Sequence, residues 1–178
     1  MKEIALDNGK IMLCDDNDYL LFKHMKICTN YGDGKPKYAR TWSFIRSKEK
    51  GKKGNNKCVL IHKLLIKCPP GMVIDHINRN GFDNRRENLR VVSQKENSRN
   101  QGLHKLQKNG FKGIRKRPSK HQEIWQAFIM VDYKQINLGY YKTKEEAARA
   151  RDIGTLKYHG PYGHLNFPRE NYENTKDS

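Results

Sequence analysis

The residues best suited to catalysis are an Asp-His pair at the end of an apolar run. Residues 72–74 are Met-Val-Ile, and Asp75 and His76 follow directly. A carboxylate oxygen is a ligand that Mg²⁺ prefers, and a neutral imidazole, with an ordinary pKa near ~6.5, can take a proton from water at neutral pH. Such a pair suits phosphodiester hydrolysis, which needs an activated water and neutralisation of charge at the phosphate.

An asparagine further along the chain could complete this site. Asn97 lies 21 residues after His76. Mg²⁺ binds through one or two protein oxygens and completes its coordination with water and phosphate. The carboxylate of Asp75 and the amide oxygen of Asn97 would therefore make a minimal site for this cation.

The elements that must position these groups are short. Two predicted strands, 72–76 and 89–92, flank a polar loop. The capping-box spacing of Ser93 and Glu96 then predicts a helix that contains Asn97. Strand, loop, strand and helix in this order would bring the Asp-His pair and Asn97 within reach of one another.

An additional histidine precedes these elements. His62 follows the apolar run 58–61 and begins a predicted short helix. It could line the site or contact a phosphate, and it could equally be a packed, hydrogen-bonded histidine. The sequence leaves its role open.

Three separated blocks in this region resemble the HNH endonucleases, most closely the H-N-N subtype of phage and intron-encoded homing enzymes. The resemblance implies a ββα-metal nuclease domain over 1–101, with its core motif at 58–101. It implies that His76 is the general base and that Asn88 holds this histidine in position. The blocks are Asp75–Asn78, Asp83–Arg90 and Glu96–Asn100.

The same resemblance suggests a cofactor and a substrate contact. Asn97 stands where the family name has a third His, which disfavours Zn²⁺ and favours Mg²⁺, with Mn²⁺ as an alternative. Asp75 and Asn97 would be the metal ligands. Arg85 and Arg86 are expected to face the phosphates of the substrate.

Five further blocks follow one another in the last part of the chain: Gly110–Pro118, Trp125–Ile129, Leu138–Thr143, Glu145–Ala150 and Leu165–Pro168. Through these blocks, 109–168 is similar to the plant Apetala/ethylene-response-factor DNA-binding domain. The resemblance implies three antiparallel strands packed on one helix, so the expected fold class of the whole chain is α+β. Similar modules are fused to phage homing endonucleases.

The strands of this second module predict two different faces. Trp125, Ala127, Ile129 and Val131 alternate and should face the helix as core. The opposite face could lie in a major groove, where Arg recognises guanine and Asn or Gln recognises adenine. The expected DNA-contacting residues, the first three of which match contact positions of the plant family, are Lys112, Arg115, Arg117, Gln135 and Asn137, with Gln126, Phe128 and Met130 on the same face.

This module also departs from the plant family. Ser119 and Asn137 stand where that family has Trp, and Phe128 and Met130 replace an acidic residue and an Arg. The family's target sequence therefore cannot be transferred. A degenerate module that contacts only phosphates is the alternative interpretation.

Other segments have simpler interpretations. Residues 48–57 form a basic stretch that either contacts phosphate or is only solvated. The cluster Asp15, Asp16 and Asp18 lacks the Gly and Glu of a calcium-binding loop and is interpreted as a turn. The remaining predicted segments are a linker at 102–108 and a polar, frayed tail at 169–178.

Composition limits the class of protein. Lys and Arg exceed Asp and Glu by 36 to 19, so the net charge is +17, and the excess is spread over both halves of the 178 residues. A pI near 9.8 and short apolar runs exclude a membrane span and favour a polyanionic partner. The expected partner is double-stranded DNA, and the expected state is a cytoplasmic monomer with four free cysteines.

Two hypotheses from different classes remain. The first is a divalent-metal-dependent DNA endonuclease, of the homing type found in phages and mobile elements. The alternative is a non-catalytic DNA-binding regulator with a decayed nuclease fold. The presence of Asp75, His76, Asn88 and Asn97 together favours the first. Nicking of one strand and cutting of both remain open.

Overall fold

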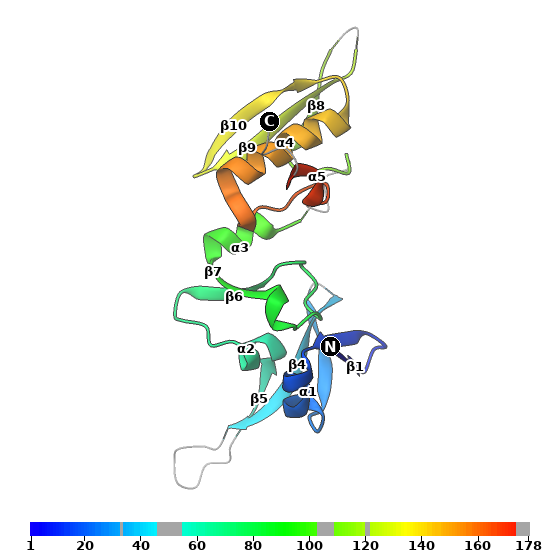
Figure 1. The fold of residues 1–178 in the computed structure, drawn as a ribbon, viewed down its shortest axis with the longest axis vertical. Coiled ribbons are helices and arrows are strands. Elements are labelled where there is room, and N and C mark those ends of the chain that lie inside the picture. Colours follow the sequence, from blue (N-terminus) through cyan, green and yellow to red (C-terminus); the bar gives the residue numbers. More distant parts are fainter. Residues whose placement is uncertain (33, 46–54, 103–108, 120–121, 174–178) are drawn as a thin grey trace. The chain divides into compact units, whose positions relative to one another are not determined.

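The chain folds into two compact units in the computed structural model, Met1–Gln94 and Lys95–Ser178. Several small sheets and few helices make up the molecule (Figure 1), which confirms the mixed character of the expected fold class. The basic stretch at 48–57 and the linker at 102–108 lie largely outside the described residues. The residues described are 1–32, 34–45, 55–102, 109–119 and 122–173.

The first unit contains three antiparallel sheets. β1 pairs with β2, β3–β4–β5 form a three-stranded sheet, and β6 pairs with β7. The strands of this unit are β1 Lys2–Ala5, β2 Ile11–Cys14, β3 Ile27–Gly32, β4 Lys35–Ile45, β5 Asn55–Leu60, β6 Met72–His76 and β7 Leu89–Ser93.

Short helices fill the spaces between these sheets. They are α1 Asp16–Phe22, α2 Ile61–Leu65 and the 3₁₀ turn η1 Arg86–Asn88. The interpretation of the acidic cluster as a turn is wrong, because α1 begins directly after Asp15. Acidic residues in the first turn suit the helix dipole, and Phe22 at its end is buried in the core. The core of the unit also contains Met12, Cys14, Ile61 and Leu65.

The loop between β6 and β7 is fixed by β2 and β4. Leu13 donates its backbone N–H to the carbonyl of Phe82 and accepts from the N–H of Asn84, both at 2.9 Å. Gly81 lies against β4 so closely that an added Cβ would be 2.0 Å from the carbonyl oxygen of Lys37. Only glycine fits there, so this close contact fixes the position of the loop against β4.

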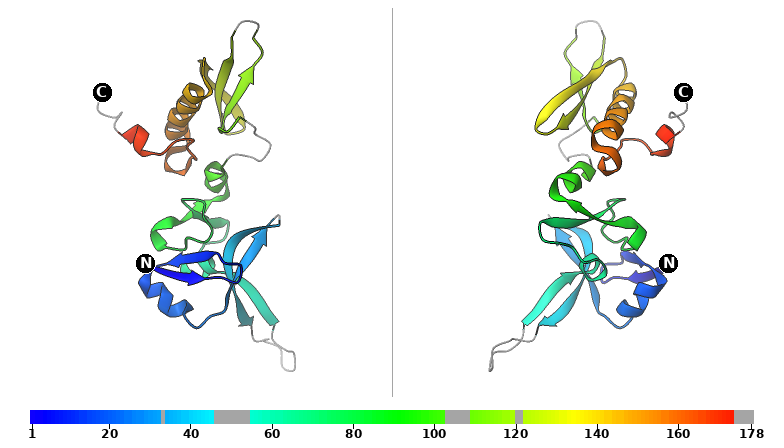
Figure 2. Two further views of the ribbon diagram at one scale, coloured as in Figure 1. Left: turned by 90° about the vertical axis from the view of Figure 1, so that its right-hand side faces the viewer. Right: turned by 60° about the vertical axis from the view of Figure 1, so that its left-hand side comes forward.

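The second unit is a three-stranded antiparallel sheet in the order β10-β9-β8, and α4 packs on one face of it (Figure 2). Ile114, Ala127, Ala147 and Ala148 form the buried centre of this packing, and Trp125 packs against it. The elements are β8 Ile114–Arg117, β9 Ile124–Val131, β10 Lys134–Tyr141, α4 Lys144–His159, the 3₁₀ turn η2 Gly160–Tyr162 and α5 Glu170–Glu173.

Residues 169–173, which were predicted to belong to a frayed tail, are held against the second unit. Tyr172 is buried, and its hydroxyl donates to Asp152 Oδ2 at 2.9 Å. The same carboxylate, fully buried on α4, accepts from the backbone N–H groups of Asn166 and Phe167. Asp152 therefore holds the segment after α4 against the unit.

Two further features concern the whole described chain. The structure records all four cysteines as free thiols, as expected. No helix among the described residues has the length and apolar character needed to cross a membrane.

Candidate functional site

Asp75 and His76 end β6, and both are buried in the first unit. In the β6–β7 hairpin, Asp75 is opposite Arg90. Arg90 donates from Nε and Nη2 to Asp75 Oδ2, at 2.9 and 2.8 Å. The carboxylate expected to hold a cation is therefore also held by an arginine.

Arg90 was not among the predicted site residues. The signal was present, because two strands joined by a loop form an antiparallel hairpin, and its register determines which residues face each other. The register of this hairpin could not be derived, since the long loop between the strands contains no short turn that sets it.

Three aromatic rings form a cluster at the candidate base. The ring centroids of His62 and His76 are 5.1 Å apart in a T-shaped arrangement, and Tyr38 lies 5.5 Å from His62 and 5.8 Å from His76. His62 therefore lies at the site, an alternative that the sequence left open. Its Nδ1 is buried with no hydrogen-bond partner among the described residues.

Burial dominates the electrostatics of this cluster. It lowers the pKa of His62 to about 4, with a further contribution from the neighbouring His76. The pKa of His76 is also lowered by burial, against the opposing effects of the Asn84 amide and of Asp75 and Asp83. Both imidazoles are therefore neutral at pH 7, the form in which a histidine can accept a proton.

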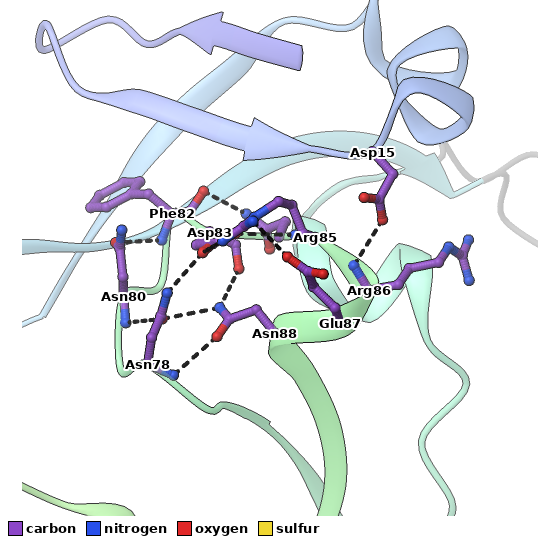
Figure 3. Close-up of polar contacts among 10 residues, drawn as sticks. Asp15, Asn78, Asn80, Phe82, Asp83, Arg85, Arg86, Glu87 and Asn88 are labelled. Carbon is purple, nitrogen blue, oxygen red and sulfur yellow. Dashed lines mark hydrogen bonds and ion pairs between the residues drawn. The ribbon is translucent and has the colours of Figure 1, made fainter. Parts of the chain in front are cut away.

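Asn88 closes the loop that follows His76 (Figure 3). Its side-chain oxygen accepts from the backbone N–H of Asn78 at 3.0 Å, and its Nδ2 donates to the carbonyl of Asp83 at 2.8 Å. Its backbone carbonyl accepts from the N–H of Ile77. Asn88 thus ties together the residues directly after His76 and the far side of the loop.

The two arginines expected to face phosphate are both bound to carboxylates. Arg85 donates from Nε and Nη2 to the buried Asp83, at 2.8 and 2.7 Å, and this pairing lowers the pKa of Asp83. Arg86 makes a bidentate pair with Asp18 of α1, with both distances 2.8 Å. These pairs link the loop to itself and to the first helix.

The described part of the chain offers few metal ligands. It contains no group of three His, Cys, Asp or Glu side chains that could hold a metal ion. Asn97 lies on α3, Gln94–Asn100, which belongs mostly to the second unit. Its pairing with Asp75 in one site stays a prediction.

In the second unit, three of the five predicted DNA-contacting residues form one hydrogen-bonded row across the sheet, together with Gln126. Arg115 and Arg117 of β8 both donate from Nε to Gln126 Oε1 of β9, at 2.8 and 2.9 Å. Gln126 Nε2 donates to Asn137 Oδ1 of β10 at 2.8 Å. The guanidinium carbon of Arg115 also lies 5.0 Å from the centre of the Phe128 ring.

The other two predicted contacts are outside this row. Gln135 is exposed on β10. The Lys112 ammonium donates to the backbone carbonyls of Arg99 and Gln101 at the end of α3. Free carbonyls at a helix C-terminus attract a cation, so Lys112 has a structural partner within its own unit.

Comparison with known proteins gives matches of two kinds. Residues 67–99 match the HNH endonuclease family, which supports a nuclease. Over 69 residues, the chain is 38% identical to Protein 3.8 of Escherichia phage T7, covering 39% of this chain and 55% of that protein.

The other matches are to plant proteins. The chain is 52% identical over 40 residues to the AP2-like ethylene-responsive transcription factor ANT of Arabidopsis thaliana, and 54% identical over 35 residues to CRL5 of Oryza sativa subsp. japonica. These stretches are 22% and 20% of this chain but only 7% and 6% of the plant proteins. The chain therefore spans a small part of each plant relative and about half of the phage protein.

Proposed function

We propose that this chain is a DNA endonuclease that hydrolyses phosphodiester bonds in its first unit and binds double-stranded DNA through its second. The observation that carries the proposal is the buried His76 at the end of β6, with its following loop closed by Asn88. The match of residues 67–99 to the HNH endonucleases supports the same conclusion.

The chain's own residues have distinct roles in the proposed reaction. The neutral imidazole of His76 takes a proton from the attacking water, as a general base. Asn88 keeps the loop after His76 in place through its contacts with Asn78 and Asp83. The rings of His62 and Tyr38 pack against the imidazole of this base and restrict its orientation.

The donor set fits one hard cation better than a zinc ion. Zn²⁺ sites need three or four His, Cys or carboxylate ligands, and the described residues contain no such group. Mg²⁺ or Mn²⁺ could be held by Asp75 together with Asn97, because a carboxylate has lone pairs for both a cation and Arg90. When bound, the cation would neutralise charge on the phosphate and on the leaving oxygen.

The second unit supplies the attraction to DNA in this proposal. Its sheet face contains two arginines and an asparagine, and its similarity to plant transcription factors supports a DNA partner. The likeness to a phage protein fits a homing endonuclease of a phage or mobile element. We propose a monomer that acts in the cytoplasm of the host cell.

One observation favours the alternative of a DNA-binding regulator without activity. Arg90 already satisfies Asp75 Oδ2, as expected for a site that no longer needs a cation. A regulator would bind DNA with the same salt dependence as the nuclease but would not cleave the phosphodiester backbone of the DNA.

Incubation of the purified chain with supercoiled plasmid separates the two functions. With Mg²⁺, we expect nicked or linear product, and with EDTA we expect none. The His76→Ala variant under the same conditions controls for a contaminating nuclease. Intact plasmid with Mg²⁺ and with Mn²⁺, at concentrations where the chain is bound, would favour the regulator.

A further inference from the structure

In the hydrogen-bonded row of the second unit, the chemistry of the side chains determines which atom donates and which accepts each hydrogen bond. Arginine has only donors, so the atom of Gln126 that faces Arg115 and Arg117 must be its oxygen. The amide nitrogen of Gln126 then faces Asn137, and the atom that receives its hydrogen bond must be Oδ1. The orientation of both amides follows from the two arginines.

This row uses all the acceptors of its members. An amide oxygen has two lone pairs, and Gln126 Oε1 accepts from two arginines. Asn137 Oδ1 accepts from Gln126 and, at 3.3 Å, from the backbone N–H of Gly139. The β10 strand has an irregularity between Asn137 and Gly139, and Gly139 has a φ of 124°, which favours glycine.

What remains for a ligand is a set of donors. Among the residues that the structure describes, Gln126 uses only the Nε of each arginine, so the terminal Nη1 and Nη2 groups remain for a ligand. Within the same residues, the Nδ2 group of Asn137 also remains. Among the described residues no carboxylate pairs with Arg115 or Arg117, so both positive charges also remain on this face.

Gln126 is itself inaccessible to a ligand. Only 3% of it is exposed, although it lies on the sheet face opposite α4. The side chains that it binds cover it, and Arg115 lies over the ring of Phe128 as well. Its role is therefore to hold two guanidinium groups and one amide in place.

We propose that Gln126 is a positioning residue: by holding the guanidinium groups of Arg115 and Arg117, it makes this face accept guanine, the base expected for arginine in the major groove, and exclude adenine. This inference rests on the proposed function and names its DNA target more closely. Guanine presents two acceptors, O6 and N7, which match the two terminal nitrogens of an arginine. Adenine presents an acceptor beside the N6 donor, and that donor would meet an N–H group.

Asparagine does not recognise adenine here, contrary to the general pairing expected from sequence. An asparagine contacts adenine by giving a donor to N7 and an acceptor to N6. Asn137 Oδ1 is occupied twice within the sheet. Its Nδ2 can serve only an acceptor, such as guanine O6 or N7 or thymine O4.

A phosphate contact needs no such arrangement. Phosphates are bound by cationic and neutral polar side chains and by backbone N–H groups, and these contacts fix the orientation of a protein on the duplex without sequence information. Two arginines held by one buried amide, one of them also over an aromatic ring, have lost the freedom that a phosphate contact tolerates. Restricted donors are what a bidentate base contact requires.

The test uses the full chain with EDTA and a library of double-stranded DNA with randomised sequence. We expect the wild-type chain to select sites with guanines. Replacing one such guanine by adenine or by 7-deazaguanine, which lacks the N7 acceptor, should weaken binding by about 10-fold. The Gln126→Met variant removes both hydrogen-bonding atoms at nearly the same volume and should lose this discrimination, while keeping its affinity for random DNA.

Two variants control for structure. Gln122→Met is the same change at an exposed glutamine and should behave as wild type. Gln126→Glu keeps an oxygen acceptor for both arginines and should keep guanine discrimination, but its negative charge should lower the affinity for random DNA and change the preference at the base next to Asn137. Thermal unfolding of each variant shows whether the unit is still folded.

Three results would overturn the inference. One is a Gln126→Met variant, folded, that still discriminates against 7-deazaguanine as strongly as the wild-type chain. Another is a wild-type chain that binds DNA without guanine preference, which would mean that the arginines contact phosphate. The third is a chain that binds no DNA at low salt, which would overturn the proposed function as well.

Discussion

Two sets of arginines, one in each unit, have different partners. In the first unit, Arg85, Arg86 and Arg90 each bind a buried or nearly buried carboxylate, so the positive charge is neutralised where it stands. In the second, Arg115 and Arg117 bind a neutral amide, so their orientation is restricted but their charge remains. An arginine bound to a carboxylate serves the fold, whereas one bound to an amide is available to an anionic partner.

This difference also divides the chemistry. The first unit places its uncharged histidines in a buried cluster beside ion pairs, which suits proton transfer in a fixed geometry. The second unit presents charge and hydrogen-bond donors on an open sheet face. Cutting and recognition should therefore respond to different substitutions.

The largest expected effect tests the assignment of catalysis to the first unit. His76→Ala should lower the rate of plasmid cleavage by about 10²–10⁴-fold, the usual effect of removing a general base. The affinity for DNA should hardly change, because His76 is buried and uncharged. Single-turnover cleavage and equilibrium binding measure the two quantities.

His24→Ala is the matched control, since His24 is exposed in the same unit. It should cleave at the wild-type rate. A folded His76→Ala chain that cuts as fast as wild type would remove catalysis from this site.

The second expectation tests whether the arginines of the first unit serve the fold. Arg86→Ala leaves the buried carboxylate of Asp18 without its bidentate partner. Loss of one member of such a pair should cost about 3 kcal/mol of unfolding free energy in the first unit. Native-state hydrogen exchange of amides in each unit measures this loss separately for the two units.

Arg117→Ala is the comparison in the second unit. Gln126 keeps Arg115 and Asn137 as partners, so we expect a loss below about 1 kcal/mol there. Equal losses for Arg86→Ala and Arg117→Ala would mean that the carboxylate and amide pairings have the same structural role.

The third expectation concerns DNA affinity instead of stability. Arg115→Ala should weaken binding to a selected site by about 1–3 kcal/mol. Arg85→Ala should change binding by no more than about 0.5 kcal/mol, because its charge is already neutralised by Asp83. Filter binding over a range of salt concentrations gives both affinities and the number of phosphate contacts.

The outcome could also be the reverse. If Arg85→Ala lowers affinity and reduces the salt dependence by about one phosphate contact, then the ion pair with Asp83 opens on DNA, and Arg85 contacts phosphate as its sequence context predicts.

The fourth expectation concerns pH and the buried His62. An unfolded histidine takes up a proton below about pH 6.5, whereas folding lowers the pKa of His62 to about 4. The unfolded state therefore binds more protons in this window, and stability must fall as the pH falls from 6.5 toward 4. Between pH 7 and pH 5, the part due to His62 is about 2 kcal/mol.

His62→Phe preserves an aromatic ring in the cluster and removes the titrating group. Hydrogen exchange in the first unit should show a pH dependence shallower by that amount than in the wild-type chain. An unchanged pH dependence would mean that folding does not lower the pKa of His62.

Local sequence patterns predicted the secondary-structure elements better than they predicted the contacts between side chains. The apolar run before Asp75 predicted β6, and the alternation around Ala127 predicted the buried face of β9. Both patterns follow from neighbouring residues alone. Helix α1 was not predicted, because the four apolar residues at its C-terminal end, 19–22, also suit a strand. In the structure they belong to the helix, and Phe22 is buried.

Partners far apart in sequence could not be predicted. Asp18 and Arg86 are separated by 68 positions, and nothing in the residues around Arg86 distinguishes a partner on α1 from a phosphate. Gln126 was recognised as a member of its face, but its two arginine donors follow from the strand register. Tyr172 lies in a polar tail, and only the fold shows that its hydroxyl donates a hydrogen bond to Asp152.

The smallest expected effect concerns α4, the helix that supports the recognition face without contacting DNA. Thr143 Oγ1 accepts from the backbone N–H of Glu146, and the Glu146 carboxylate accepts from the N–H of Thr143, so these two residues form a complete capping box at the start of α4. Thr143→Ala should cost about 1 kcal/mol in the second unit, seen by hydrogen exchange, and Thr143→Ser should restore most of it. Because α4 packs on the face of the sheet opposite Gln126, neither variant should change guanine discrimination. A loss of discrimination in Thr143→Ala as large as that in Arg115→Ala would mean that the arrangement of the arginines depends on the helix behind the sheet as well as on the amide that binds them.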